Sequence, residues 1–426
     1  MPDIQVLVND FVSKLRKRKI EGSDATARLT AELLRSVISQ QPTTSGGAAL
    51  IEAVKSVGEQ LIAANPVELA VGNIVRQVLH IIRKEDFSLV TNAVGVLKLS
   101  AEANDEEIFK EENEQNPSTA AVDGRCLLRA PLLHALHDQL PYSATACQIS
   151  ALGDSSEGKA AEKIARSWKL KHDVIKAVNE LIEDLNTCHE PIAEQAVELI
   201  HHKHDSATPK CILTLLLIVF SEVILTLGRS RFVLEFLKAA KEKKRSFHVF
   251  IAEGAPRYQG HVLAKELSAK GLKTTVITDS AVFAMISRVN MVVLGVHAVM
   301  ANGGVIAPVG SNMVALAAKK HAVPLVVVAG VHELSSLFPQ NPELSLNEIG
   351  SPSELLNFGE FSDCMDYGIG CGSPLLHVVN PVFDYVPPEL VSLFVTDAGA
   401  YNPSYIYQLI ADYYSPDDLT PQKPAS

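Results

Sequence analysis

Short runs of Val, Ile and Leu alternate with amphipathic helical patterns through the second half of this chain. The runs are apolar throughout, which indicates strands buried on both faces, as in a parallel sheet covered by helices. Residues 222–426 are therefore predicted to form an α/β domain with a mostly parallel sheet. The expected strands are 223–227, 248–253, 274–278, 291–295, 324–329 and 390–396. The expected helices are 231–241, 261–269, 281–287, 312–321 and 403–414.

Residues 1–98 carry helical periodicity alone and predict an N-terminal helical domain. In the first segment Val8, Phe11 and Leu15 recur at three- and four-residue spacing, which places them on one helical face. Ser23 or Asp24 is suited to cap the second helix. The expected helices are 4–19, 23–40, 48–64 and 66–83.

Between these two domains the periodicity is lost. Seven acidic residues and one lysine lie between Glu102 and Glu114, and small residues are abundant in the rest of the segment. Such a composition buries too little apolar surface to offset its ordering entropy, so residues 99–164 are predicted to be an acidic, low-complexity linker. A contact surface for a partner is the alternative. Expected helices at 168–182 and 192–201, within residues 165–204, join the linker to the sheet.

Residues 205–221 form an atypical apolar insert before the first expected strand, where a few residues would suffice. The apolar run Cys211–Phe220 has ten residues, too few to span a bilayer, and no membrane association is predicted. The preceding HHKHD segment, residues 201–205, contains metal-ligating residue types. Because no rigid element fixes their spacing, no metal site is predicted there.

The charge and cysteine content exclude further classes of protein. The 426-residue chain has a formal net charge of −11, which gives no support for nucleic-acid binding. Its six cysteines include no C-x-x-C pair, so reduced thiols are expected rather than a disulfide framework. The first residues lack the basic and apolar segments of a secretory signal. A cytosolic protein is predicted.

A glycine-rich crest, Val289–Gly310, includes one expected strand and precedes a helix expected from Ser311. In an open α/β sheet, ligands and catalytic groups gather outside the carboxyl ends of the strands. Here the side chains are mostly apolar, and His297 is the one titratable group of the crest. The segment 302–304 (NGG) lacks the spacing of a dinucleotide fingerprint and predicts a tight turn. With no P-loop lysine motif either, no nucleotide or other cofactor is expected.

Six segments of the chain are distinctive: 11–40, 65–82, 247–260 (FHVFIAEGAPRYQG), 301–304 (ANGG), 381–390 (PVFDYVPPEL) and 402–407 (NPSYIY). Together they resemble one family, the beta subunits of eukaryotic translation initiation factor two-B. The resemblance implies an N-terminal helical domain followed by a Rossmann-like domain with a mostly parallel sheet, in agreement with the patterns above. Family members join the helix near residue 201 almost directly to the strand at 223. This raises the hypothesis that the insert is translated intervening sequence or a gene-model error.

The same family is similar to methylthioribose-1-phosphate and ribose-1,5-bisphosphate isomerases. A sugar-phosphate isomerase or a sugar-phosphate-binding protein is therefore the alternative function. The resemblance places the isomerases' catalytic cysteine at Gly228, an arginine at Ala255, the general acid at His297, and an Asn-Lys pair at Ala307-Pro308. An isomerase needs groups for proton transfer and phosphate binding, so these residues imply that catalysis is lost. Arg229, Arg231 and Arg257 are the remaining candidates for anion binding.

The resemblance implies a non-catalytic regulatory subunit of the guanine-nucleotide exchange factor for initiation factor two. The expected partners are the alpha, gamma, delta and epsilon subunits and initiation factor two, mainly its alpha subunit, whose phosphorylation would be sensed. Exchange activity is expected in the epsilon subunit. Aromatic residues beside prolines suit an interface. The candidate partner interface consists of Asn380, Phe383, Asp384, Tyr385 and Pro387.

Overall fold

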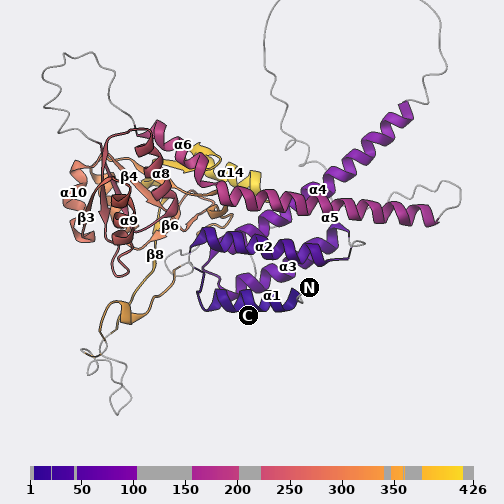
Figure 1. Ribbon diagram of the computed structural model, residues 1–426, viewed down its shortest axis with the longest axis horizontal. Helices are drawn as coiled ribbons and strands as arrows, with labels where there is room; N and C mark the ends of the chain where they lie inside the picture. The colour runs from indigo at the N-terminus through magenta and orange to yellow at the C-terminus, as the bar shows by residue number, and fades with distance from the viewer. Residues whose placement is uncertain are drawn as a thin grey trace, which may run out of the picture. The chain divides into compact units, whose positions relative to one another are not determined.

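The computed structural model describes residues 4–20, 22–42, 46–102, 156–200, 222–339, 347–357, 359 and 377–415 (Figure 1). The chain divides into two compact units, one of residues 1–87 and 167–426 and one of residues 88–166. The described part of the second unit consists of the end of helix α4 (Leu69–Glu102) and the beginning of helix α5 (Ser156–Thr187). The first unit contains the sheet and the site.

The N-terminal part of the first unit is a set of helices whose apolar faces pack together. Phe11, Leu34 and Leu61, from three successive helices, are buried. The helices are α1 (Ile4–Arg16), α2 (Ser23–Gln40), α3 (Gly47–Ala64) and the beginning of α4. The expected helical start of the chain is confirmed, with ends within a few residues of the prediction for the first three helices.

Helix α4 differs from its prediction at both ends. It begins at Leu69 instead of residue 66, because Asn65–Glu68 form a turn closed by a hydrogen bond from the Glu68 N–H to the Asn65 carbonyl. It continues beyond Arg83 to Glu102, since the residues directly after Arg83 include neither Gly nor Pro to end a helix.

Several predicted features lie wholly or partly outside the described residues. Of the predicted linker, residues 103–155 lie outside, while its flanks, 99–102 and 156–164, are helical. The HHKHD segment and the apolar insert also lie outside. Among the cysteines only Cys188 is described, and it is buried and free. No described helix is both long enough and apolar enough to cross a membrane.

A seven-stranded sheet in the order β10-β9-β7-β4-β1-β2-β3 forms the centre of the C-terminal part. Neighbouring strands are parallel except β9 and β10, so the predicted mostly parallel sheet is confirmed. The antiparallel edge strand β10 was not expected. The strands are β1 (Glu222–Leu227), β2 (Phe247–Ala252), β3 (Lys273–Ile277), β4 (Met291–Gly295), β7 (Leu325–Val328), β9 (Leu393–Thr396) and β10 (Gly399–Tyr401).

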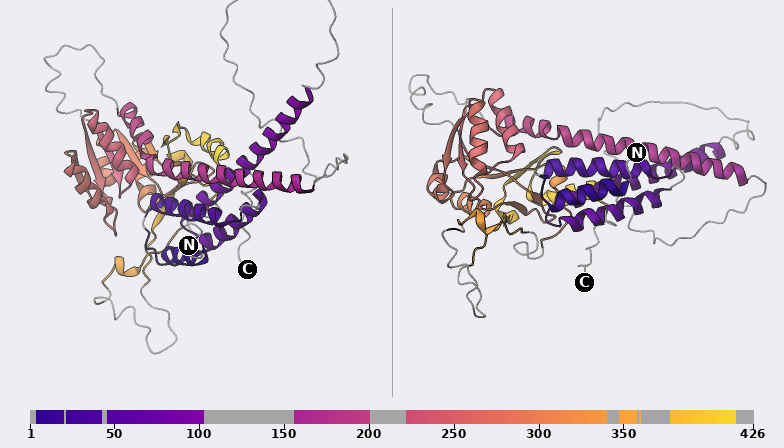
Figure 2. Two further views of the ribbon diagram at one scale, coloured as in Figure 1. Left: turned by 45° about the vertical axis from the view of Figure 1, so that its right-hand side comes forward. Right: turned by 60° about the horizontal axis from the view of Figure 1, so that its bottom comes forward.

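Helices cover both faces of this sheet (Figure 1, Figure 2). Successive strand residues point to opposite faces. In β1, Leu225 joins the core formed with α10, α11 and α14, whereas Ile224 joins the core formed with α6, α8 and α9. This double burial explains why the strands read as uninterrupted apolar runs. The helices are α6 (His189–Leu199), α8 (Arg231–Glu242), α9 (Gln259–Ala269), α10 (Val282–Met285), α11 (Ser311–Lys320) and α14 (Ile406–Tyr413).

The crest folds as part of a second, antiparallel sheet that the sequence patterns did not predict. Strands β5 (Ala298–Val299) and β6 (Val305–Pro308) form a hairpin, and β6 also pairs with β8 (Phe383–Val386). These strands have two to four residues, too few to show a periodicity, and β8 comes from a distant part of the chain.

Proline and turn residues shorten three expected elements. The strand expected from residue 390 begins at Leu393, because two prolines lead into a 3-10 turn, η6 (Pro388–Leu390). The helix expected from residue 403 likewise begins as a 3-10 turn, η7 (Pro403–Tyr405). The helix expected over 281–287 is divided, with short 3-10 turns on both sides of α10.

Gly260 in α9 provides a test of the packing between this helix and β2. A Cβ atom at Gly260 would overlap the Ala252 carbonyl oxygen and lie 2.9 Å from that of Glu253. We expect Gly260→Ala to lower the free energy of unfolding by about 1–3 kcal/mol despite the higher helix propensity of alanine, because backbone atoms cannot move aside. Urea unfolding followed by circular dichroism measures this change.

Gly72→Ala in α4 is the matched control. A Cβ atom there would approach only flexible side-chain ends, those of Arg76 at 3.1 Å and Ile62 at 3.7 Å. This variant should be as stable as the wild type or slightly more stable. Equal stability of the two variants would contradict the proposed backbone clash.

Candidate functional site

The strand order reverses at β1, which places a topological switch point between β1 and β4. Open α/β sheets bind ligands at such a point, outside the carboxyl ends of the strands. The loops that end β1 and β2 meet there, since a Cβ atom at Gly254 would lie 3.5 Å from the Gly228 Cα. The loop after β1 also approaches the end of β4, where a Cβ atom at Gly295 would overlap the Ser230 side chain.

Gly228 and Ala255 occupy the ends of β1 and β2. Gly228 has a φ of +67°, and a Cβ atom added there would meet no atom within 4 Å. Ala255 is exposed, and its N–H donates to the Asp279 carboxylate at 2.7 Å, as the Gly254 N–H does at 2.9 Å. Neither position offers a group that transfers protons, and the loop between β2 and α9 is held by Asp279.

His297, two residues after the end of β4, faces the N-terminal helices. Its Nε2 lies 3.2 Å from the Val67 carbonyl oxygen and 3.9 Å from a Glu68 carboxylate oxygen. The ring stacks on Phe383 with ring centres 4.5 Å apart, and 13% of the side chain is exposed. The imidazole therefore contacts the turn that precedes α4, where it helps hold the N-terminal helices against the crest.

The N-terminus of helix α11 is occupied by a carboxylate of the same chain. Asp384 accepts hydrogen bonds from the N–H groups of Gly310 at 2.7 Å and Asn312 at 3.2 Å. Free N–H groups and the helix dipole make such a terminus attractive to phosphate. Since Asp384 already accepts these N–H groups, an external anion would have to displace it. Pro308 lies nearby in β6, paired with Phe383, and Ala307 is fully buried.

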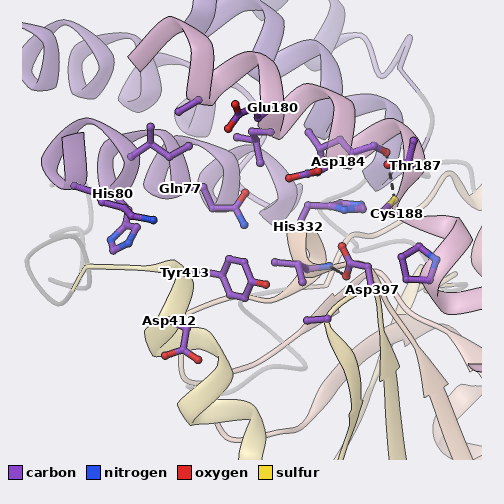
Figure 3. A pocket seen from close by; sticks show the side chains of 18 of the residues that line it. Gln77, His80, Glu180, Asp184, Thr187, Cys188, His332, Asp397, Asp412 and Tyr413 are labelled. Carbon is purple, nitrogen blue, oxygen red and sulfur yellow. Dashed lines mark hydrogen bonds between the residues drawn. The ribbon is translucent and has the colours of Figure 1, made fainter. Parts of the chain in front are cut away.

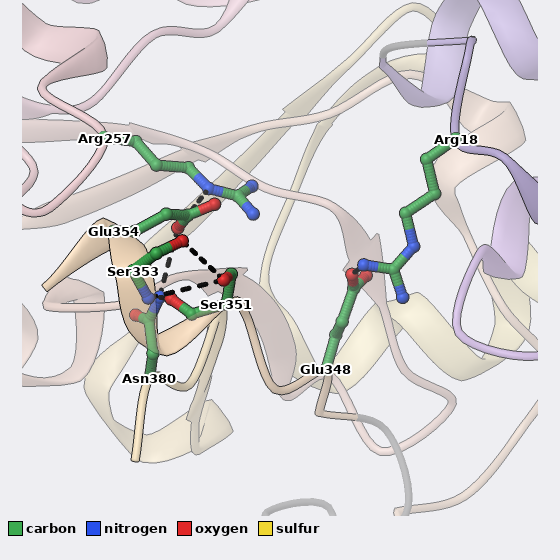
Figure 4. Close-up of polar contacts among 7 residues, drawn as sticks. All are labelled: Arg18, Arg257, Glu348, Ser351, Ser353, Glu354 and Asn380. Atoms are coloured by element: carbon green, nitrogen blue, oxygen red, sulfur yellow. Dashed lines mark hydrogen bonds and ion pairs between the residues drawn. The ribbon is translucent and has the colours of Figure 1, made fainter. Parts of the chain in front are cut away.

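The arginines considered for anion binding are each paired with a carboxylate. Arg229 contacts Glu266 at 2.8 Å, and Arg231 pairs with Asp24 of α2. Arg257 contacts Glu354 at 3.3 Å (Figure 4). These pairs oppose the recruitment of a phosphate by the same guanidinium groups.

The predicted interface residues have internal partners. Asn380 is 3% exposed and donates to the Ser351 carbonyl and to the Glu354 carboxylate (Figure 4). The Tyr385 hydroxyl accepts a hydrogen bond from the Asn302 amide at 2.8 Å. Phe383 and Pro387 are half-buried, as is Asp384. Their role in a partner interface stays a prediction.

The tight turn predicted at 302–304 is confirmed. The Asn302 side-chain oxygen accepts from the Gly304 N–H at 3.0 Å, and Gly303 has a φ of +79°. This turn closes the β5–β6 hairpin and contacts Tyr385, so its glycines serve the packing of the small sheet.

The loop after β7 holds polar residues that sequence patterns did not single out. Glu333 is 2% exposed and accepts a hydrogen bond from the Ser23 hydroxyl of α2 at 2.5 Å. His332 is 1% exposed, and its backbone carbonyl accepts from Asn73 of α4 at 3.0 Å. Burial raises the pKa of Glu333 well above its ordinary value and lowers that of His332 to about 4. The only local signal for these two residues is that a His-Glu pair follows an apolar strand. Their burial could not be predicted from it, because the contacting helices α2 and α4 are far away in the sequence.

Comparison with known proteins decides the family. A model of the initiation factor 2 subunit family matches residues 19–403. The chain belongs to this family. It is 37% identical over 409 residues to the translation initiation factor eIF2B subunit beta of Dictyostelium discoideum, covering 96% of this chain and 95% of that protein. It is 32% identical over 420 residues to the same subunit of Schizosaccharomyces pombe, with 96% of each chain covered.

Solved structures and a related enzyme complete the comparison. The crystal structure of eIF2B beta from Chaetomium thermophilum has the same fold, with a TM-score of 0.63, 22% identity, and 98% of this chain and 94% of that chain covered. A chain of the tetrameric eIF2B-beta2-delta2 complex from C. thermophilum gives a TM-score of 0.59 at 21% identity, over 97% of this chain and 96% of that chain. The ribose 1,5-bisphosphate isomerase of Archaeoglobus fulgidus is 32% identical over 194 residues, covering 44% of this chain and 56% of that enzyme.

The buried Glu333 predicts a pH-dependent stability. Because burial raises its pKa, the folded state binds this proton more tightly than the unfolded state. The stability that this bound proton contributes is fully present below the ordinary pKa of a glutamate carboxyl. It is lost as the pH rises from that ordinary pKa toward the raised pKa of folded Glu333. Glu333→Gln mimics the protonated acid, so its unfolding free energy relative to wild type should increase between pH 5 and pH 8. The increase should be about 1.4 kcal/mol for each pH unit of this interval that lies below the raised pKa of Glu333. Urea unfolding at each pH measures it.

Glu59→Gln, at an exposed position on α3, is the control and should show no such trend. A stability difference between Glu333→Gln and wild type that is the same at both pH values would refute the effect of burial.

Proposed function

We propose that this chain is a non-catalytic regulatory subunit of the guanine-nucleotide exchange factor for initiation factor two. The observation that carries the proposal is the end-to-end similarity to eIF2B beta subunits, at 37% identity over 95% of the Dictyostelium protein. The contacts at the switch point also support it. His297, Asp384 and the nearby arginines all have partners within the chain, which supports a structural rather than a substrate-binding use of these groups.

The subunit would act by coupling two surfaces. It would help bind the alpha subunit of initiation factor two, and the free energy of that contact would differ between the phosphorylated and unphosphorylated forms. Binding of the alpha subunit would thereby change the exchange activity of the epsilon subunit. The coupling free energy between the two sites would be about 1–3 kcal/mol. No catalytic group is required of this chain. Its partners would be the alpha, gamma, delta and epsilon subunits in the cytosol, with the segment from Asn380 to Pro387 as a candidate interface.

Affinity purification of the tagged full-length chain from its native cells tests the assembly. We expect the other four subunits to co-purify, because a regulatory subunit of this family would act only within the complex. Mass spectrometry of the eluate identifies them, and a tagged unrelated cytosolic protein is the control. Recovery of the chain without any of these subunits would overturn the proposal.

The alternative function is a sugar-phosphate isomerase, favoured by the 32% identity to the Archaeoglobus enzyme over 194 residues. Incubation of the purified chain with ribose 1,5-bisphosphate, followed by NMR, should show no conversion to the ketose. Measurable turnover that disappears in His297→Asn would establish the alternative. The contacts of Asp384 at α11 and the paired arginines are the physical reasons to expect none.

A further inference from the structure

A cavity separate from the switch point lies beside the carboxyl ends of β7 and β9. Its volume is about 530 Å³, and its walls come from helices α4, α5, α6 and α14 and from the loops after the two strands. Figure 3 shows Gln77 of α4 and Tyr413 of α14 directed toward one shared space, and His332 of the β7 loop lies beside it with its ring toward Cys188. None of the predicted isomerase positions lines it.

The ionisable side chains around this cavity are mainly acidic. Five carboxylates and one lysine, Lys84, belong to the lining. Burial, with the neighbouring Asp184 carboxylate as a smaller cause, raises the pKa of Asp397 to about 6, so Asp397 is still mostly ionised at neutral pH. The carboxylates come from separate elements and surround the space from several sides. They are Glu85, Glu180, Asp184, Asp397 and Asp412.

Two buried side chains of the lining have polar atoms without partners. Gln77 is 5% exposed, and its side-chain oxygen has no hydrogen-bond partner. His332 is 1% exposed, and neither ring nitrogen has a partner. Leaving a buried polar group unsatisfied is unfavourable because it has lost its hydrogen bonds to water, so native proteins usually pair such groups. The Gln77 oxygen accepts hydrogen bonds only. Since burial lowers the pKa of His332 to about 4, its neutral ring offers one acceptor nitrogen and one N–H donor.

The remaining lining is apolar. Ile81, Leu181, Leu185 and Val331 lie between the carboxylates. Unpaired acceptors, surrounding carboxylates and an apolar wall together match a ligand with N–H donors, positive charge and an alkyl stem. Among the described residues no three His, Cys, Asp or Glu side chains are placed to hold a metal ion, which favours an organic cation.

We propose that this cavity binds a small linear polyamine. The ammonium groups would contact the carboxylates and the Gln77 oxygen, and the alkyl chain would lie along the apolar side chains. This site would respond to a cationic metabolite, unlike the anionic substrates of the related isomerases. The inference stands apart from the proposed function, because it rests on the cavity alone.

Calorimetric titration of the full-length chain with spermidine tests the proposal. We expect saturable binding of one ligand per chain, and no binding of 1,4-butanediol, which has a four-carbon chain without charge. Asp184→Asn and Asp397→Asn should each weaken spermidine binding about tenfold, since each removes the negative charge that strengthens a hydrogen bond from an ammonium group. The amide introduced by Asp397→Asn would keep an oxygen to accept from the Val331 N–H, as the Asp397 carboxylate does at 2.8 Å.

Glu183→Gln is the matched control, because Glu183 is exposed on α5 beside Asp184 and does not line the cavity. It should bind spermidine like the wild type. Circular dichroism checks the fold of each variant, and Gln77→Leu, which removes the unpaired oxygen without removing charge, provides a second test with the same expected direction. Absence of saturable binding at millimolar spermidine would overturn the proposal. So would equal weakening by Glu183→Gln, or displacement of spermidine by equimolar Mg²⁺.

Discussion

The turn after strand β7 joins the two halves of the first unit. It follows a fully buried strand, so its position is fixed by the sheet, and its polar groups then determine how the N-terminal helices dock. Side chains of α2 and α4 donate hydrogen bonds to this turn. Tyr414, directly after α14, also donates to it, and backbone N–H groups of the turn donate to the loops of neighbouring strands. The contacts are Ser23 to Glu333, Asn73 to His332, Tyr414 to Leu334, Val331 to Asp397 and Ser335 to Val299. Burying Glu333 and His332 is unfavourable for their charged forms, which makes this junction sensitive to pH.

Polar groups near the switch point of the sheet also have partners within the chain. His297 contacts the turn before α4, Arg231 pairs with Asp24 of α2, and Asp384 occupies the start of α11. In a related enzyme fold the same region would need groups free to meet a substrate. Here the polar groups stabilise the packing of the chain on itself. This arrangement agrees with a protein whose proposed role depends on surfaces and assembly, and it leaves the acidic cavity between α4, α5 and α14 as a place with unpaired buried groups.

The parts of the site that were predictable are those with a local signal. The NGG turn was identified because glycine permits the positive φ that residue 303 adopts. His297 was singled out as the one titratable group of the crest, but its partner Val67 is 230 residues away. Likewise, nothing local relates Asp384 to the N–H of Gly310, since strand β8 reaches β6 only in the folded chain. Gln77 and Asp397 gave no signal, because a cavity is a property of several elements together.

The sequence by itself determined the first three helices, the buried parallel strands and the family. A helix buried on one face leaves a periodic apolar pattern, and a strand buried on both faces leaves a continuous apolar run; both signals are local. Only the tertiary structure decided the antiparallel sheet of β5, β6 and β8, the docking of α2 and α4 on the β7 turn, and the charge around the cavity. These depend on pairs of residues distant in the sequence, whose hydrogen bonds and desolvation exist only when the chain brings them together.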